Sequence, residues 1–152
     1  AYTYGDKTIR VTPRNVVCQW TSDATTYKLY ESITVSMTVT SGSWYIKDLY
    51  GFGYYGSVND PRVYVWISVE QPISGAGVDH AYLIVYKAGT LVAKIDLTTG
   101  SFVYGSPPFD LSPKEAFQLD LDISILNTGT NPVTYSFKVG FYVSQQSAEA
   151  PR

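Results

Sequence analysis

Apolar and polar residues alternate along most of this chain with a period of two. Residues 31–40 show the pattern most clearly, because Ile33, Val35, Met37 and Val39 are apolar and every position between them is Ser or Thr. Such alternation is typical of a β-strand with one face buried and the other in water. On this basis the sequence predicts strands over residues 15–21, 31–40, 44–50, 62–71, 80–86, 90–97, 117–125 and 132–144.

Turn-forming residues separate these strands and suggest how they connect. Lys87-Ala88-Gly89 predicts a hairpin over residues 80–97, and the Asn, Thr, Gly and Pro residues of 127–132 predict a longer hairpin from 117 to 144. Residues 51–60, 71–77 and 98–113 are expected to be connections. Helical signals are confined to one short turn at residues 112–115. The prediction is an all-β protein, an Ig-like or jelly-roll-type β-sandwich over residues 15–144.

The segment that precedes the sandwich, residues 1–14, is predicted to be an extended arm and hinge. Tyr2 and Tyr4 share one parity, and Ile9 and Val11 share the other. A bulge or bend between the two pairs would keep one face apolar. Pro13 cannot donate a hydrogen bond to a ladder, so strand pairing should break there. At the other end, residues 145–152 form a polar tail.

Composition narrows the class of protein further. The chain has 152 residues, 16% of them charged, and a formal net charge of −2, which excludes a strongly basic nucleic-acid binder. One cysteine cannot form a disulfide within the chain. No apolar stretch approaches the roughly 18 residues of a membrane helix. The chain begins with Ala1 rather than Met, so we expect that a leader has been removed and that the mature protein is extracellular.

Few residues suggest chemistry. His80 is the single histidine, and its neighbour Asp79 is expected on the opposite strand face, so we interpret His80 as an ordinary strand residue. Cys18 shares the parity of apolar neighbours and is interpreted as a core residue. Asp120 and Asp122 share a face, which we interpret as solvated. We therefore expect no catalytic residues, no metal and no cofactor, and a protein that is not an enzyme.

Aromatic residues make one conspicuous cluster, interleaved with glycines. Three interpretations stay open for it: packing of a loop over the end of the sandwich, contact with another subunit, or stacking on sugar. The residues of this predicted loop are Trp44, Tyr45, Tyr50, Phe52, Tyr54 and Tyr55.

The last third of the chain resembles a known kind of protein. Residues 121–137, a strand, an Asn-Thr-Gly-Thr turn and a second strand, look like the hairpin of extracellular β-sandwich filament subunits. The most similar families are the archaeal bundling pili and threads and the TasA/camelysin biofilm fibre proteins. The arm before the sandwich matches their layout. Camelysins were classed as metalloproteases, but no zinc-ligand pattern is present here, so that activity is not carried over.

The resemblance implies polymerisation by donor-strand complementation, in which the arm of one subunit completes the sheet of the next. Such a head-to-tail contact does not close and so builds a helical homopolymer, with filament bundling as a further contact. The donor residues would be Tyr2, Tyr4, Ile9 and Val11, and residues 132–144 are the expected wall of the acceptor groove. The function expected is a structural pilus subunit for adhesion, biofilm or cell–cell contact. A carbohydrate-binding module and a viral capsid or spike protein are the alternatives.

Overall fold

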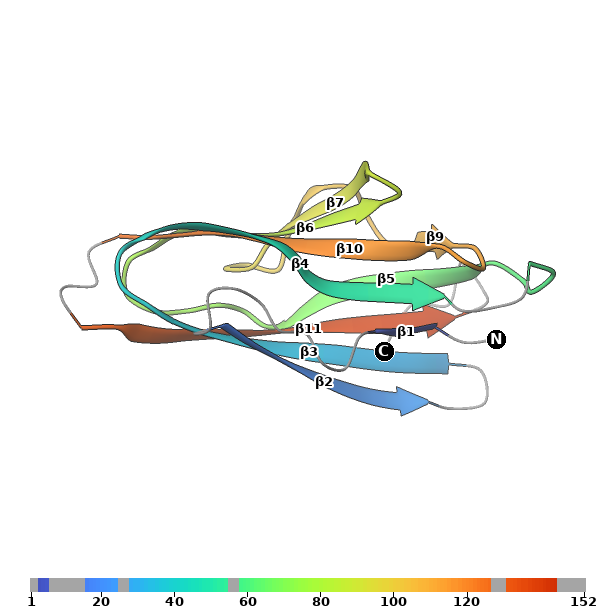
Figure 1. The fold of residues 1–152 in the computed structure, drawn as a ribbon, viewed down its shortest axis with the longest axis horizontal. Helices are drawn as coiled ribbons and strands as arrows, with labels where there is room; N and C mark the ends of the chain where they lie inside the picture. The colour runs from blue at the N-terminus through green and yellow to red at the C-terminus, as the bar shows by residue number, and fades with distance from the viewer. Residues whose placement is uncertain (1–2, 6–15, 25–27, 55–57, 127–130, 145–152) are drawn as a thin grey trace.

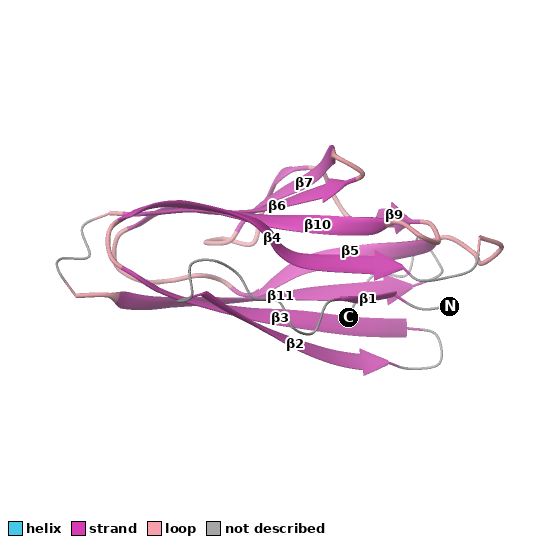
Figure 2. Cartoon of the chain, in the orientation of Figure 1, coloured by secondary structure: helices cyan, strands magenta, loops and turns pink. Residues whose placement is uncertain are grey.

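The computed structural model describes residues 3–5, 16–24, 28–54, 58–126 and 131–144 and shows two antiparallel sheets packed face to face (Figure 1). Within these residues the chain forms strands and connecting loops and no helix (Figure 2). Sheet A consists, in spatial order, of β1 (Thr3–Gly5), β4 (Gly42–Tyr54), β10 (Ala116–Ile125), β6 (Val78–Lys87), β7 (Thr90–Asp96) and β8 (Phe102–Tyr104). Sheet B consists of β2 (Val16–Ala24), β3 (Lys28–Val39), β11 (Val133–Ser144), β5 (Val63–Gln71) and β9 (Phe109–Leu111).

Eight of these strands have the order of a jelly roll. Strand β3 pairs with β11, β4 with β10, β5 with β9 and β6 with β7, all antiparallel. These are the pairs of one long hairpin of eight strands that has been wound into two sheets. The predicted β-sandwich is therefore confirmed, and β1, β2 and β8 are additions to its sheet edges.

The core lies between the sheets and is rich in aromatic rings. Phe141 of β11 stacks on Tyr50 and Phe52 of β4 with centroid distances of 5.8 and 4.9 Å. Phe117 of β10 continues the stack from Phe52. Because these rings come from both sheets, their stacking stabilises the packing of one sheet against the other. Alternating apolar residues in β3, β10 and β11 contribute further residues to this core, as do β4, β5, β6 and β7.

The predicted hairpin over residues 117–144 is wrong. Strand β10 lies in sheet A between β4 and β6, whereas β11 lies in sheet B between β3 and β5. Both strands bury one apolar face, and the structure packs those faces against each other across the core instead of placing the strands side by side. Strand β11 pairs with β3 along its whole length and with β5 over residues 138–144, so over residues 138–144 it offers no edge to a donor strand.

The hairpin of β6 and β7 is confirmed, with Ala88 and Gly89 at positive φ in its turn. The short turn after residue 112 is confirmed as well. There the Ser112 amide donates to Glu115 Oε1 at 2.7 Å, and the Glu115 amide donates to the Ser112 carbonyl at 3.1 Å. Strands β8 and β9 were not predicted, because each has three residues within a segment rich in Gly, Ser and Pro.

The connection from β5 to β6 ties the two sheets together. The Ile73 amide donates to the Leu97 carbonyl, and the Tyr135 hydroxyl of β11 donates to the Ala76 carbonyl at 2.6 Å. The Leu126 amide then donates to the Gly77 carbonyl at 2.6 Å. Among the described residues, no helix is long and apolar enough to cross a membrane.

Candidate functional site

The first candidate region is the edge of sheet A, where β1 adds to β4. Thr3, Tyr4 and Gly5 lie opposite Tyr54, Gly53 and Phe52, in antiparallel register. Of the expected donor residues, Tyr4 therefore belongs to a strand, while Tyr2, Ile9 and Val11 lie outside the described residues. Residues 42–46 of β4 have β10 as their only ladder partner in the described part of the chain.

Backbone geometry shows which way the groups of this edge point. The Tyr54 amide donates to the Glu115 carbonyl and the Tyr54 carbonyl accepts from the Lys114 amide, so both groups point toward the β10 side. Successive residues of a strand direct their N–H and C=O groups to opposite sides. The groups of Gly53 therefore point to the outer edge, where β1 pairs.

The aromatic cluster, expected as a strand over residues 44–50 and as a connection from residue 51, lies on one continuous strand over most of its length. Residues 42–54 form β4, and the side chains of Tyr50, Phe52 and Tyr54 are buried in the core. Trp44 is half-buried and packs against that core, whereas Tyr45 is 53% exposed. Tyr55 lies outside the described residues. Gly51 and Gly53 made residues 51–54 look like a connection, yet these glycines alternate with the buried rings of Phe52 and Tyr54 as strand residues do.

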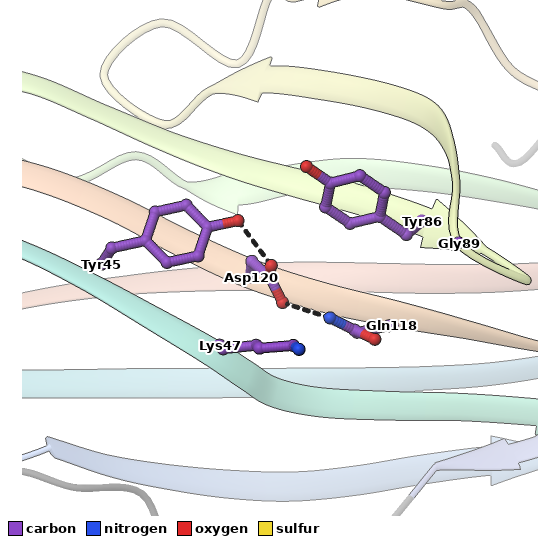
Figure 3. A pocket seen from close by; sticks show the side chains of 6 residues that line it. All are labelled: Tyr45, Lys47, Tyr86, Gly89, Gln118 and Asp120. Atoms are coloured by element: carbon purple, nitrogen blue, oxygen red, sulfur yellow. Dashed lines mark hydrogen bonds between the residues drawn. The ribbon is translucent and has the colours of Figure 1, made fainter.

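The second candidate region is a pocket of about 320 Å³ on the outer face of sheet A (Figure 3). Tyr45 and Lys47 come from β4, Gln118 and Asp120 from β10 and Tyr86 from β6; Gly89 of the β6–β7 turn completes the lining. These three strands are neighbours in the sheet, so register brings together residues that are far apart in sequence.

Asp120 organises this pocket. Its side chain accepts a 2.5 Å hydrogen bond from the Tyr45 hydroxyl at Oδ2. At Oδ1 it accepts bonds from the Asp48 amide (2.9 Å) and from Gln118 Nε2 (3.0 Å). Asp120 is only 2% exposed, so its predicted solvation is wrong. A buried carboxylate needs such donors, and here they fix both a ring and an amide at the rim of the pocket.

A bulge in β4 makes the arrangement possible. The register of β4 against β10 shifts between the pairs of Leu119 and Leu121, and Asp48 adopts φ 56° there. Three residues of β4, 47–49, lie opposite the single residue 120 of β10, and the Asp48 amide turns toward Asp120 instead of a ladder partner. The carboxylate thus satisfies a backbone donor that the bulge would otherwise leave without a partner.

Tyr45 is held as a hydrogen-bond donor. Burial raises the pKa of its phenol well above the usual value, and the hydrogen bond to Asp120 and the nearby Tyr86 raise this pKa further. The hydroxyl proton therefore stays on Tyr45 across the physiological pH range. The ring is consequently fixed in place even though half of its surface is open to solvent.

His80, Tyr82 and Lys94 extend this polar and aromatic face across β6 and β7. His80 stacks on Tyr82 at 5.4 Å and Lys94 Nζ lies 4.2 Å from the centre of the Tyr82 ring. His80 also contacts Asp122 at 3.2 Å and Asp79 at 3.3 Å, so the expectation that Asp79 turns away is wrong. Stacking and paired contacts account for His80 as a residue of the sheet face.

Of the residues that line the pocket, Tyr45 and Asp120 stand out in the sequence, but nothing in the sequence connects them, and Lys47, Tyr86 and Gln118 carry no signal there. The shared parity of Gln118 and Asp120 was visible, but the partner strands of β10 were not. Cys18 lies in β2, where only the backbone is described. Among the described residues, no group of three or more His, Cys, Asp or Glu side chains is arranged to hold a metal ion.

Comparison of the chain with protein-family models and with curated proteins of known function gives no match.

Proposed function

We propose that this protein is the structural subunit of an extracellular filament that polymerises when the N-terminal arm of one copy adds to sheet A of the next. The filament would serve adhesion, biofilm formation or cell–cell contact. The jelly roll is shared by capsid proteins, lectins and other proteins, so the fold does not decide between these functions.

The observation that carries the proposal is the place of β1. Residues 3–5, near the beginning of the chain, pair with β4. Strand β4 is the edge strand of sheet A among the eight strands of the jelly roll, so β1 adds to that edge from outside. The same edge can pair with the same segment of a neighbouring copy, because the backbone contacts are identical. Each copy would add its arm to sheet A of one neighbour and would receive, on its own β4 edge, the arm of another neighbour. This contact is head-to-tail, so it propagates into a fibre.

The register of β1 assigns roles to the donor residues. Gly5 lies opposite Phe52, so a donor that continues in this register places Lys7 opposite Tyr50. Beyond Tyr50 the bulge of β4 adds two residues, so a regular donor strand places Ile9 opposite the buried Ile46, as β10 does with Leu121. Val11 follows two residues later on the same core-facing side, opposite Trp44.

Tyr4 has a different role in this register, because it lies opposite Gly53. Phe52 and Tyr54 face the core, so Gly53 between them faces outward. The donor tyrosine would cover backbone that the glycine leaves bare, as aromatic residues do for edge glycines. Tyr2 precedes it on the same parity and would lie on the same face.

The test blocks the edge without altering the β10 ladder. Gly53→Pro removes the amide that points to the donor, while Gly53→Ala retains it and is the matched control. In negative-stain microscopy we expect long fibres for the unchanged protein and for Gly53→Ala, and none for Gly53→Pro. Deletion of residues 1–12 should likewise give a soluble, less stable sandwich without fibres.

Fibres that persist after both the deletion and Gly53→Pro would contradict the proposal. Closed shells formed by the unchanged protein would favour a capsid protein instead. Single particles of uniform size at all concentrations would leave the protein as a monomeric binding module.

A further inference from the structure

The pocket on the outer face of sheet A is complete within one chain. Its tyrosines, amide and ammonium come from β4, β10 and β6, and no residue of the arm contributes to the described lining. An inference about its ligand therefore does not depend on filament formation.

The pocket is preorganised. The Tyr45 ring and the Gln118 amide are both hydrogen-bonded to Asp120, whose side chain is buried. Groups that are already held in place lose little conformational entropy when a ligand binds. The exposed Tyr45 ring is thus held in one orientation by a buried carboxylate, whereas an ordinary surface tyrosine is free to change its rotamer.

The polar groups differ in what they still offer a ligand. Both oxygens of Asp120 accept hydrogen bonds from protein donors. Lys47, in contrast, forms no ion pair or hydrogen bond with any described residue, although it lines the pocket. The Gln118 side chain donates one N–H to Asp120, which leaves its carbonyl oxygen and second N–H for other partners.

We propose that this pocket binds an acidic saccharide, with one hexuronate residue packed on the Tyr45 ring and its carboxylate paired with Lys47. The C–H face of a sugar ring is apolar and packs on an aromatic ring, while its hydroxyls suit the Gln118 amide and the Tyr86 phenol. The volume of about 320 Å³ is at the small end of ligand sites, which suits one residue of a longer chain.

The open rim supports a polymeric ligand. Lys47 and Gly89 are exposed, and a Cβ placed on Gly89 would meet no atom within 4 Å. Neighbouring sugar residues can therefore leave the pocket over the β6–β7 turn. A small ligand that needs full enclosure would fit such a site less well.

The test measures binding of galacturonate oligomers, and of galactose oligomers of equal length, to the full-length chain by isothermal titration calorimetry at low salt. We expect the acidic oligomer to bind about tenfold more tightly than the neutral one, since one charge-assisted contact separates them. Lys47→Gln should abolish that difference. Tyr45→Ala should weaken binding of both oligomers by about tenfold or more.

Two matched variants control for general surface effects. Tyr104 of β8 lies on the same sheet and is 53% exposed, as Tyr45 is, but it does not line the pocket. Lys114 is exposed, as Lys47 is, and does not line the pocket either. Tyr104→Ala and Lys114→Gln should therefore bind both oligomers as the unchanged protein does. Circular dichroism checks that each variant retains its β-sheet.

The proposal is overturned if the unchanged protein does not bind the acidic oligomer, or binds both oligomers equally. It is also overturned if Lys47→Gln keeps the preference, or if Tyr104→Ala loses as much affinity as Tyr45→Ala. Because Lys47 is exposed, its variant decides the question even if Tyr45→Ala fails to fold.

Discussion

At the scale of single residues, Asp120 shows how a sheet face that looks polar in sequence acquires a specific structure. Alternation correctly placed Asp120 and Asp122 on the outer face of their strand. Alternation cannot reveal that a bulge in β4 directs a backbone amide at Asp120, or that Tyr45 lies over it. Those contacts depend on which strands are neighbours, so the pocket was beyond prediction from the sequence.

Two tyrosines should make the fold sensitive to alkaline pH. Burial raises the pKa of Tyr45, as described above, and burial followed by the charge of Asp60 raises the pKa of Tyr54 above the usual 10.0. Below that usual pKa both phenols are protonated in the folded and the unfolded chain, so their contribution to stability is fully present. At higher pH the unfolded chain loses these protons first, and the free energy of unfolding falls.

Urea unfolding measured from about pH 8 to about pH 11 checks this expectation. The unchanged protein should lose stability steeply above about pH 10, and the double variant Tyr45→Phe with Tyr54→Phe should lose it less steeply. Equal slopes for the two proteins would show that other groups govern the alkaline transition.

At the scale of elements, the sequence predicted the strands better than their partners. Eight strands were expected, and all eight exist with boundaries shifted by a few residues. The pairing of β10 with β11 was wrong because a turn-like segment between two alternating strands fits both a hairpin and a crossing between sheets. Only the packing of the two apolar faces against each other distinguishes these outcomes, and it is a property of the whole sandwich.

The start of β6 offers an element-scale prediction. Gly77 has φ +79°, and a Cβ there would lie 1.7 Å from the Leu126 carbonyl oxygen. Gly89 has the similar φ of +78° but open space around it. Gly89→Ala should lower the free energy of unfolding by roughly 1–2 kcal/mol, through backbone strain alone. Gly77→Ala also breaks the hydrogen bond from the Leu126 amide, so it should lower the free energy of unfolding by about 2–4 kcal/mol.

Chemical denaturation of the two variants measures this difference directly. Because the φ angles of Gly77 and Gly89 match, any larger loss of unfolding free energy in Gly77→Ala than in Gly89→Ala comes from the close approach between the β5–β6 connection and the end of β10. Equal losses of stability in the two variants would mean that the connection shifts freely and does not tie the sheets together.

At the scale of the whole molecule, the central question is whose arm lies on β4. The single chain pairs its own β1 with that edge. In a filament of the proposed kind, the equivalent strand comes from the neighbouring copy with the same backbone contacts. Both arrangements place residue 4 opposite residue 53, so a covalent bond between those positions records which chain donated the strand.

A cysteine pair makes this record. In a Cys18→Ser background, Tyr4→Cys and Gly53→Cys join Cα positions that are directly opposite each other, about 5.5 Å apart in an antiparallel ladder and within reach of a disulfide. Oxidised fibres should give a ladder of covalent oligomers on a denaturing gel without reductant, and the ladder should collapse on reduction. Oxidised monomers should give a bridge within one chain.

The register supplies the control for this experiment. Tyr4→Cys combined with Gly51→Cys places the cysteines two residues out of register, roughly 7–8 Å apart, which is too far for a disulfide without backbone movement. This pair should give little cross-linking in either state. Fibres that contain only bridges within single chains would show that each copy keeps its own arm, and that polymerisation depends on a different surface.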